Sequence, residues 1–189
     1  MAVTSLNPSF SSPPVVSETE EYNSPWLTIK RVDKAMPSGS TASFYIRHEP
    51  DVVVCLPVTD RGTFILVEEY RHGPECSLFE IPGGIVDESE DVAAAAAREA
   101  LEETGFTGAL EHLGSTWISA YSTARKHIYL MRNARMMKDP QLEPGELLRV
   151  LEVNTEQFWD VVRNGALTDL DAALLCARAL GPEGGSGSR

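Results

Sequence analysis

The sequence has few cysteines and no long apolar run. Cys55, Cys76 and Cys176 are odd in number and lack the spacing of metal ligands. They are typical of reduced thiols, so we expect an intracellular protein, in the cytoplasm. No stretch is apolar enough to cross a bilayer, and the N-terminus shows no charged segment followed by an apolar one. We therefore expect neither a membrane partner nor a secretory signal.

Basic residues are also scarce. The chain has 16 Lys and Arg residues against 28 Asp and Glu residues, which gives a net charge of −12 at pH 7. Binding to nucleic-acid phosphates requires clustered basic side chains, and the sequence has no such run. We expect no nucleic-acid partner. Metal ions and a few local arginines would have to bind any anionic small molecule.

The distribution of residue types predicts one folded domain with flexible ends. Apolar residues make up 42% of the chain, enough for a core. The first residues are rich in Ser, Pro and Glu, which indicates an arm that is disordered or ordered only by a partner. We divide the chain into this arm (1–24), a β-hairpin (25–50), a globular domain (51–180) and a flexible tail (181–189).

The globular domain alternates between strand and helix patterns. Residues 90–104 are rich in Ala, Glu and Arg, contain no Gly or Pro and precede Gly105, which predicts a helix. Strands are expected at 52–58, 63–70, 110–118, 127–132 and 147–153, and further helices at 155–164 and 168–180. Strands on both sides of a helix, with helices at the end, indicate an α/β fold: an α/β/α sandwich around a mixed sheet.

The helix at 90–104 carries an acidic face. At about 100° per residue, Arg98, Glu99, Glu102 and Glu103 share one side. The carboxylates repel one another, and a hard divalent cation such as Mg²⁺, or Mn²⁺ in its place, removes that cost better than Zn²⁺. Arg98 can form ion pairs, with Glu90 among others, that hold the cluster in place. The alternative is an acidic helix face that is merely solvated.

The spacing around this face is more specific than the face itself. Gly84 is followed by five residues, Glu90, seven residues and then Arg98-Glu99-Ala100-Leu101-Glu102-Glu103-Thr104-Gly105-Phe106. This pattern resembles the signature box of the Nudix hydrolases, enzymes that split a diphosphate linked to another group. The resemblance implies a sandwich fold and metal binding by Glu99, Glu102, Glu103 and the backbone carbonyl of Gly83.

The identity of the general base is left open by the resemblance. In related enzymes it is often a Glu on a loop after the box, and the loop at 141–146 offers two. Glu146 aligns better than Glu143. Glu102 or Glu103 can also act as the base from the metal site.

The sequence flanking the box narrows the expected substrate. Val67–Arg71 and Phe79–Gly84 resemble the branch that hydrolyses ADP-ribose and nucleotide sugars. The resemblance implies that Arg71 contacts phosphate or ribose and that Glu80 contacts the base, the sugar or the metal site. Alternatively, Arg71 is only the exposed end of a surface strand, and Glu80 only forms a structural ion pair. The hairpin at 25–50 is similar to an extension that pairs across a homodimer in that branch.

One loop departs from the branch. Residues 118–127 lack the expected Pro-Gly and its following Glu, and contain Tyr121, Arg125 and Lys126 instead. These side chains can stack on a base or bind a second phosphate, or they can form a solvated hairpin tip.

These patterns together predict a Mg²⁺-dependent hydrolase. The resemblance to the branch implies that its small-molecule substrate is ADP-ribose or a nucleotide sugar, cleaved to a nucleoside monophosphate and a sugar phosphate. Dinucleoside polyphosphates, nucleoside triphosphates and a specialised biosynthetic diphosphate are alternatives. So is a non-catalytic nucleotide sensor, although such proteins commonly lose box acids that are present here.

Overall fold

The structure is a computed structural model that describes residues 10–142 and 145–181. Its strands are β1 (Val15–Asn23), β2 (Thr28–Ala35), β3 (Thr41–His48), β4 (Val52–Thr59), β5 (Phe64–Arg71), β6 (Cys76–Glu80), β7 (Gly83–Ile85), β8 (Phe106–Trp117), β9 (Arg125–Met136) and β10 (Leu148–Val153). Its helices are α1 (Val92–Thr104), α2 (Thr155–Arg163) and α3 (Leu170–Leu180). Contacts divide the chain into an N-terminal unit (Met1–Glu49 and Ser119–Thr123) and a main unit (Pro50–Ile118 and Ala124–Arg189).

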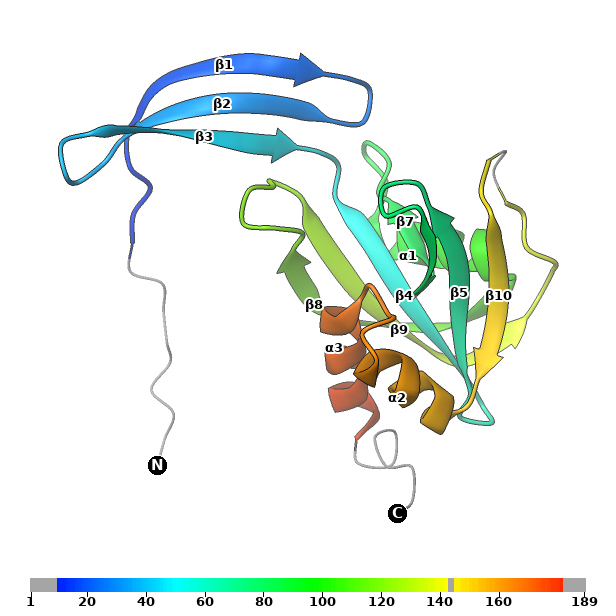
Figure 1. The fold of residues 1–189 in the computed structure, drawn as a ribbon. Helices are drawn as coiled ribbons and strands as arrows, with labels where there is room; N and C mark the ends of the chain where they lie inside the picture. The colour runs from blue at the N-terminus through cyan, green and yellow to red at the C-terminus, as the bar shows by residue number, and fades with distance from the viewer. Residues whose placement is uncertain (1–9, 143–144, 182–189) are drawn as a thin grey trace, which may run out of the picture. The chain divides into compact units, whose positions relative to one another are not determined.

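The main unit is built on a seven-stranded mixed sheet (Figure 1). The strand order is β10-β5-β4-β9-β8, with β6 beside β5 and β7 beside β4. Strands β4 and β9 are parallel, and the other pairings are antiparallel. Strand β4 is buried along nearly its whole length, as its unbroken apolar sequence predicts.

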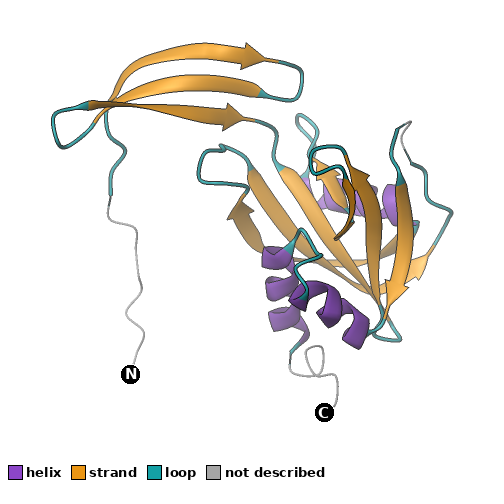
Figure 2. Cartoon of the chain, in the orientation of Figure 1, coloured by secondary structure: helices purple, strands orange, loops and turns teal. Residues whose placement is uncertain are grey.

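Helices cover both faces of this sheet (Figure 2). Helix α1 packs on one face, where Val53 and Tyr129 contact its alanines. Helices α2 and α3 pack on the other face, where Phe158 stacks on Phe64 with ring centroids 4.5 Å apart. The predicted α/β/α sandwich is therefore confirmed.

Helix α1 begins and ends at residues suited to those positions. The side chain of Asp91 accepts hydrogen bonds from the backbone N–H groups of Ala93 and Ala94, both at 3.0 Å. Gly105 ends the helix with φ of 77°, a left-handed conformation that favours glycine. The buried face consists of small residues such as Ala96 and Ala100, so the helix axis can approach the sheet closely.

The main unit also contains two strands that the sequence patterns did not predict. Strand β6 pairs with β5, and the short strand β7 pairs with the start of β4. Since β7 begins with Gly83 and Gly84, its sequence indicates a turn. Its place beside β4 brings these glycines against α1, where the signature residues lie.

The N-terminal unit is a three-stranded antiparallel sheet, in the order β1-β2-β3. The prediction of a disordered arm over 1–24 differs from the structure, because Val15–Asn23 forms strand β1. Cross-strand polar contacts stabilise this hydrophilic strand: Lys30 forms an ion pair with Glu18 at 2.7 Å, and Ser17 donates to Asp33. The predicted hairpin is thus the second and third strands of a larger sheet.

The loop between β8 and β9 belongs to the N-terminal unit by its contacts. The backbone N–H of Arg47 donates to the carbonyl of Tyr121 at 2.8 Å, and the N–H of Thr123 donates to the carbonyl of Arg47 at 2.9 Å. Ser122 donates to the carboxylate of Glu49. Segments far apart in the sequence therefore form one unit.

Parts of the expected flexible ends lie outside the described residues, namely 1–9 of the arm and 182–189 of the tail. Within the described residues, none of the helices combines the length and the apolar character needed to span a membrane.

Candidate active site

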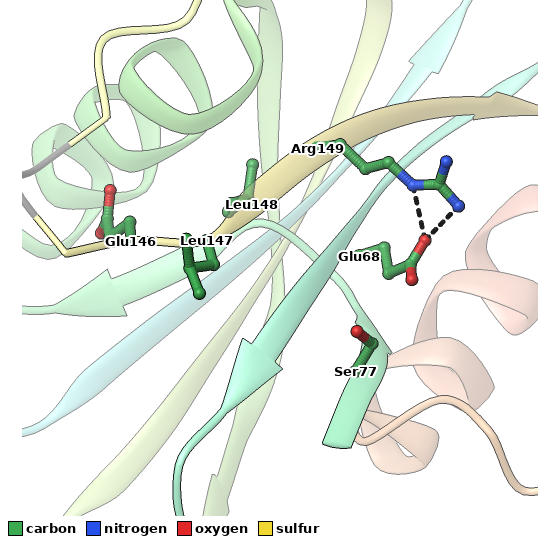
Figure 3. A pocket seen from close by; sticks show the side chains of 6 residues that line it. All are labelled: Glu68, Ser77, Glu146, Leu147, Leu148 and Arg149. Carbon is green, nitrogen blue, oxygen red and sulfur yellow. Dashed lines mark hydrogen bonds and ion pairs between the residues drawn. The ribbon is translucent and has the colours of Figure 1, made fainter. Parts of the chain in front are cut away.

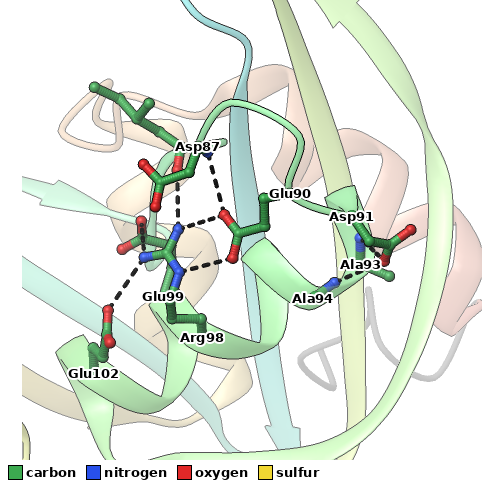
Figure 4. A network of polar contacts seen from close by, with 9 residues as sticks. Asp87, Glu90, Asp91, Ala93, Ala94, Arg98, Glu99 and Glu102 are labelled. Carbon is green, nitrogen blue, oxygen red and sulfur yellow. Dashed lines mark hydrogen bonds and ion pairs between the residues drawn. The ribbon is translucent and has the colours of Figure 1, made fainter.

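Arg98 organises the acidic face of helix α1 (Figure 4). Its guanidinium donates to both carboxylate oxygens of Glu90, at 2.9 and 2.8 Å. It also donates to Glu99 at 2.8 Å, to Glu102 at 3.2 Å and to the carbonyl of Ile85 at 3.1 Å. These bonds raise the pKa of Arg98, with the Glu90 hydrogen bond as the largest cause. Glu90, Glu99 and Glu102 are thus gathered around one permanent positive charge.

Glu103 is the buried member of the acidic face. Its residue is only 7% exposed, and its carboxylate accepts a hydrogen bond from the backbone N–H of Gly83 at 3.0 Å. Burial, together with the neighbouring charges of Glu99, Glu69 and Glu146, raises the pKa of Glu103 to about 8 against the lowering effect of the Gly83 hydrogen bond. Glu103 therefore lies in a site with an excess of negative charge.

The two glycines of β7 allow the backbone to approach the acids and the sheet. A Cβ atom on Gly84 would overlap the carboxylate of Glu99, and one on Gly83 would overlap the backbone of Val53. Residues with side chains cannot occupy either position without displacing a neighbour. The Gly-Gly sequence is therefore required by the packing of the site.

The donors at this site suit a hard divalent cation. Glu99, Glu102 and Glu103 provide only oxygen ligands, together with the nearby carbonyl of Gly83. Burial also raises the pKa of Glu99, and a cation would relieve the repulsion among these groups. Among the described residues, no three acidic, His or Cys side chains converge as they stand. Binding would require the carboxylates to turn away from Arg98 and from the Gly83 N–H.

Strands β5 and β6 add a second charged group beside the acidic face. Arg71 donates from Nε and Nη2 to the two oxygens of Glu80, both at 2.7 Å. Its Nη2 lies 3.0 Å from Glu69, and the Glu103 charge also contributes to the raised pKa of Arg71, whose largest cause is the Glu80 hydrogen bond. The structure therefore brings the predicted Arg71 and Glu80 together as an ion pair next to the box.

Glu69 is a residue of this site that sequence reasoning missed. It is 9% exposed, and burial raises its pKa, with the Glu80 and Glu146 charges acting in the same direction against Arg71. The available signal was the alternation of β5, which places Glu69 on the same face as Arg71, two residues later.

Glu146 approaches the site from the segment that precedes β10. Its charge raises the pKa of Glu99, of Glu103 and of Glu69, so it lies near all three carboxylates. This is where a loop base would be needed. The second candidate, Glu143, lies outside the described residues.

The predicted residues of the β8–β9 segment do not form a common basic tip. Tyr121 belongs to the N-terminal unit, where its side chain is exposed. Arg125 stacks over Trp117 at 4.4 Å from the ring centroid and donates to the carbonyls of Ser115 and Thr116. Lys126 is largely buried between Asp169 and Asp171, at 2.9 and 3.0 Å. Its positive charge is thus neutralised within the main unit.

A surface pocket of 370 Å³ lies at the β5–β6–β10 edge (Figure 3). It is lined by Glu68, Ser77, Glu146, Leu147, Leu148 and Arg149. Arg149 donates to Glu68 at 2.6 Å across the two strands. Because side chains alternate along β5, Glu68 faces away from Glu69. The Glu68–Arg149 pair therefore lies on the sheet face opposite the carboxylate cluster.

Comparisons with known proteins agree with this geometry. The family model described as the NUDIX domain matches residues 48–169. The chain is 28% identical over 144 residues to an ADP-ribose pyrophosphatase of Bacillus subtilis (strain 168), covering 75% of this chain and 78% of that protein. It is 27% identical over 162 residues to a CMP-5'-(N-acetyl-N-hydroxy-3-aminopropyl)phosphonate hydrolase of Streptomyces rubellomurinus (strain ATCC 31215), covering 85% and 78%.

The fold also matches a solved structure. A crystal structure of an ADP compounds hydrolase superposes with a TM-score of 0.80. The match covers 95% of this chain and all of that chain, at 21% identity. At this identity the similarity concerns the fold.

Proposed function

The chain belongs to the NUDIX family and is a Nudix pyrophosphohydrolase, and on that premise we propose that it cleaves the diphosphate linkage of a nucleoside diphosphate derivative. The main support for this proposal is the buried Glu103, whose carboxylate accepts a hydrogen bond from the Gly83 N–H beside the other box acids. Such an arrangement costs folding stability unless a cation and an anionic ligand use it.

The proposed cofactor is Mg²⁺, with Mn²⁺ as a substitute. Glu99, Glu102, Glu103 and the carbonyl of Gly83 would hold it, and when bound it supplies neutralising charge for the phosphate oxygens. Glu146 is the proposed general base, which takes a proton from the water that attacks one phosphorus. The choice rests on its proximity to Glu99 and Glu103, and Glu102 or Glu103 is the alternative.

The proposed substrate is ADP-ribose or a nucleotide sugar, which would give a nucleoside monophosphate and a sugar phosphate. The Bacillus subtilis relative supports this choice by its name, and Arg71 offers a cation beside the box acids. The Streptomyces relative acts on a CMP-linked phosphonate, so cytidine compounds belong among the test substrates.

The test is a panel of ADP-ribose, nucleotide sugars, CMP-linked compounds, dinucleoside polyphosphates and nucleoside triphosphates, assayed with Mg²⁺ for monophosphate release. We expect turnover of a nucleoside diphosphate derivative and its loss, by about a hundredfold or more, in Glu103→Gln. Glu156→Gln, an exposed site on α2, is the control and should keep full activity. Full activity in Glu103→Gln would exclude this mechanism.

A non-catalytic nucleotide sensor is the other class to test. It would show thermal stabilisation by nucleotides without any product. The intact set of box acids supports the enzyme instead.

We further propose a cytoplasmic protein. Cys55 and Cys176 are free and buried, and burial raises the pKa of both thiols, which suits reduced core residues. A thiol reagent should modify only the exposed Cys76 in the folded protein. Rapid reaction of all three thiols would contradict this assignment of the core.

A further inference from the structure

Arg71 is held by two carboxylates from adjacent strands. Glu80 on β6 accepts hydrogen bonds from Nε and Nη2 of the guanidinium in a bidentate pair, and a carboxylate oxygen of Glu69 on β5 lies 3.0 Å from the same Nη2. Two donors remain on Nη1, and none of the residues in 10–142 and 145–181 accepts a hydrogen bond from them. The Arg71 side chain is 45% exposed, so a ligand in solution can reach part of it.

Glu69 is not needed to neutralise Arg71. The bidentate Glu80 pair already balances the charge. A second carboxylate that is 9% exposed loses hydration and is repelled by Glu80 and Glu146. Such a placement costs folding stability, so its benefit must lie elsewhere.

We propose that Glu69 is a positioning residue, which pins Nη2 of Arg71 so that its Nη1 edge is presented to the substrate diphosphate. This inference rests on the proposed function of the same site. A guanidinium held by Glu80 alone can pivot with that side chain, whereas contacts from two strands fix its orientation. The Glu103 charge contributes to the raised pKa of Arg71, so this guanidinium lies within electrostatic range of the box acids.

A double-mutant cycle of Glu69→Ala and Arg71→Ala tests whether Glu69 acts through Arg71. We expect Glu69→Ala to lower kcat/KM about tenfold, mainly through a higher KM, and to have no further effect in the Arg71→Ala background. Glu69→Gln keeps an acceptor oxygen and should recover most of the loss. Equal effects of Glu69→Ala in both backgrounds would overturn the proposal.

Controls separate positioning from folding. Glu68→Gln removes the neighbouring carboxylate, which pairs with Arg149 on the opposite face, and should leave kcat/KM unchanged. The melting temperature of Glu69→Gln should equal or exceed that of the wild type, because the unfavourably buried charge is gone. A loss of activity that merely follows a loss of stability would overturn the proposal.

The same cycle is measured with α,β-methylene-ADP and Mg²⁺ as a binding probe, by calorimetry. If the wild type hydrolyses the panel but the cycle is additive, the positioning role fails and the proposed function stands. If the wild type binds the probe without turnover, the proposed function fails, and coupling of the two residues in Kd still supports the positioning role. A wild type that neither binds nor hydrolyses refutes both.

Discussion

Glu103 keeps its proton near neutral pH in the metal-free protein, because burial and the neighbouring carboxylate charges raise its pKa from 4.5 to about 8. The unfolded chain releases this proton at lower pH, so this group makes the folded state less stable as the pH rises from about 5 to 8. A divalent cation needs the deprotonated carboxylate. We therefore expect Mg²⁺ to bind about tenfold more tightly per pH unit up to about pH 8, and to raise the melting temperature more at pH 8 than at pH 6.

Calorimetric titration in buffers of different ionisation enthalpy measures the released proton directly. Glu103→Gln cannot titrate at this position and should bind Mg²⁺ weakly, with little dependence on pH. Equal Mg²⁺ affinity at pH 6 and pH 8 in the wild type would contradict the role of Glu103 as a ligand.

The two glycines of β7 should respond differently to the same substitution. In Gly84→Ala the new methyl group meets the movable carboxylate of Glu99, so we expect a folded protein with strongly reduced activity. In Gly83→Ala it meets the backbone of Val53, so we expect a loss of about 1–3 kcal/mol in unfolding free energy. Urea unfolding and turnover assays separate the two effects.

The matched control is Gly73→Ala. Nothing lies within 4 Å of a Cβ atom at Gly73. An active Gly84→Ala enzyme would show that the close approach of β7 to Glu99 is unnecessary.

The sequence predicted the acids of helix α1 and, through the flanking motifs, Arg71 and Glu80, but it missed Glu69 beside them. Helical periodicity alone places Glu99, Glu102 and Glu103 on the face of Arg98. In the structure Arg98 donates to Glu99 and Glu102, whereas Glu103 accepts from the Gly83 N–H. Alternation along β5 places Glu69 and Arg71 on one face, but the pairing of Arg71 with Glu80 depends on the register of β5 with β6. A pairing of that kind is not encoded in local spacing.

At the scale of one element, helix α1 depends on its N-terminal cap. Asp91→Ala removes the acceptor for two backbone N–H groups and should lower the free energy of unfolding by about 1 kcal/mol. Asp91→Asn retains the acceptor oxygen and should cost only a few tenths of a kcal/mol. Denaturant midpoints measure both. Equal losses would assign the effect to charge rather than to capping.

Elements with strong patterns were predictable, and elements defined by their partners were not. The apolar sequence of β4 predicts a buried strand, and the Ala- and Glu-rich sequence that ends at Gly105 predicts helix α1. Strand β1 is exposed along its whole length, so its sequence has no apolar pattern that predicts a strand. Its order depends on cross-strand pairing with β2. The three residues of β7 are too few for any periodicity.

At the scale of the whole molecule, the N-terminal unit has little core of its own. Within the described residues of this unit, Val32 is the one buried hydrophobic side chain. A three-stranded sheet with so small a core is marginally stable alone, and we propose that it pairs across a homodimer. Light scattering of the full chain should give about twice 20.7 kDa at micromolar concentration. A monomeric mass would contradict this.

The parallel pairing of β4 with β9 has a consequence for synthesis on the ribosome. Val52 lies opposite Lys126. The ribosome must therefore add roughly 70 further residues after β4 before β9 can pair with it, which takes about 4–14 s at 5–20 residues per second. During that interval the most apolar strand of the chain can pair with β5 and β7 only, which leaves one edge open. That edge of β4 therefore stays unpaired until β9 emerges, and an unpaired apolar edge is a place where a nascent chain can aggregate.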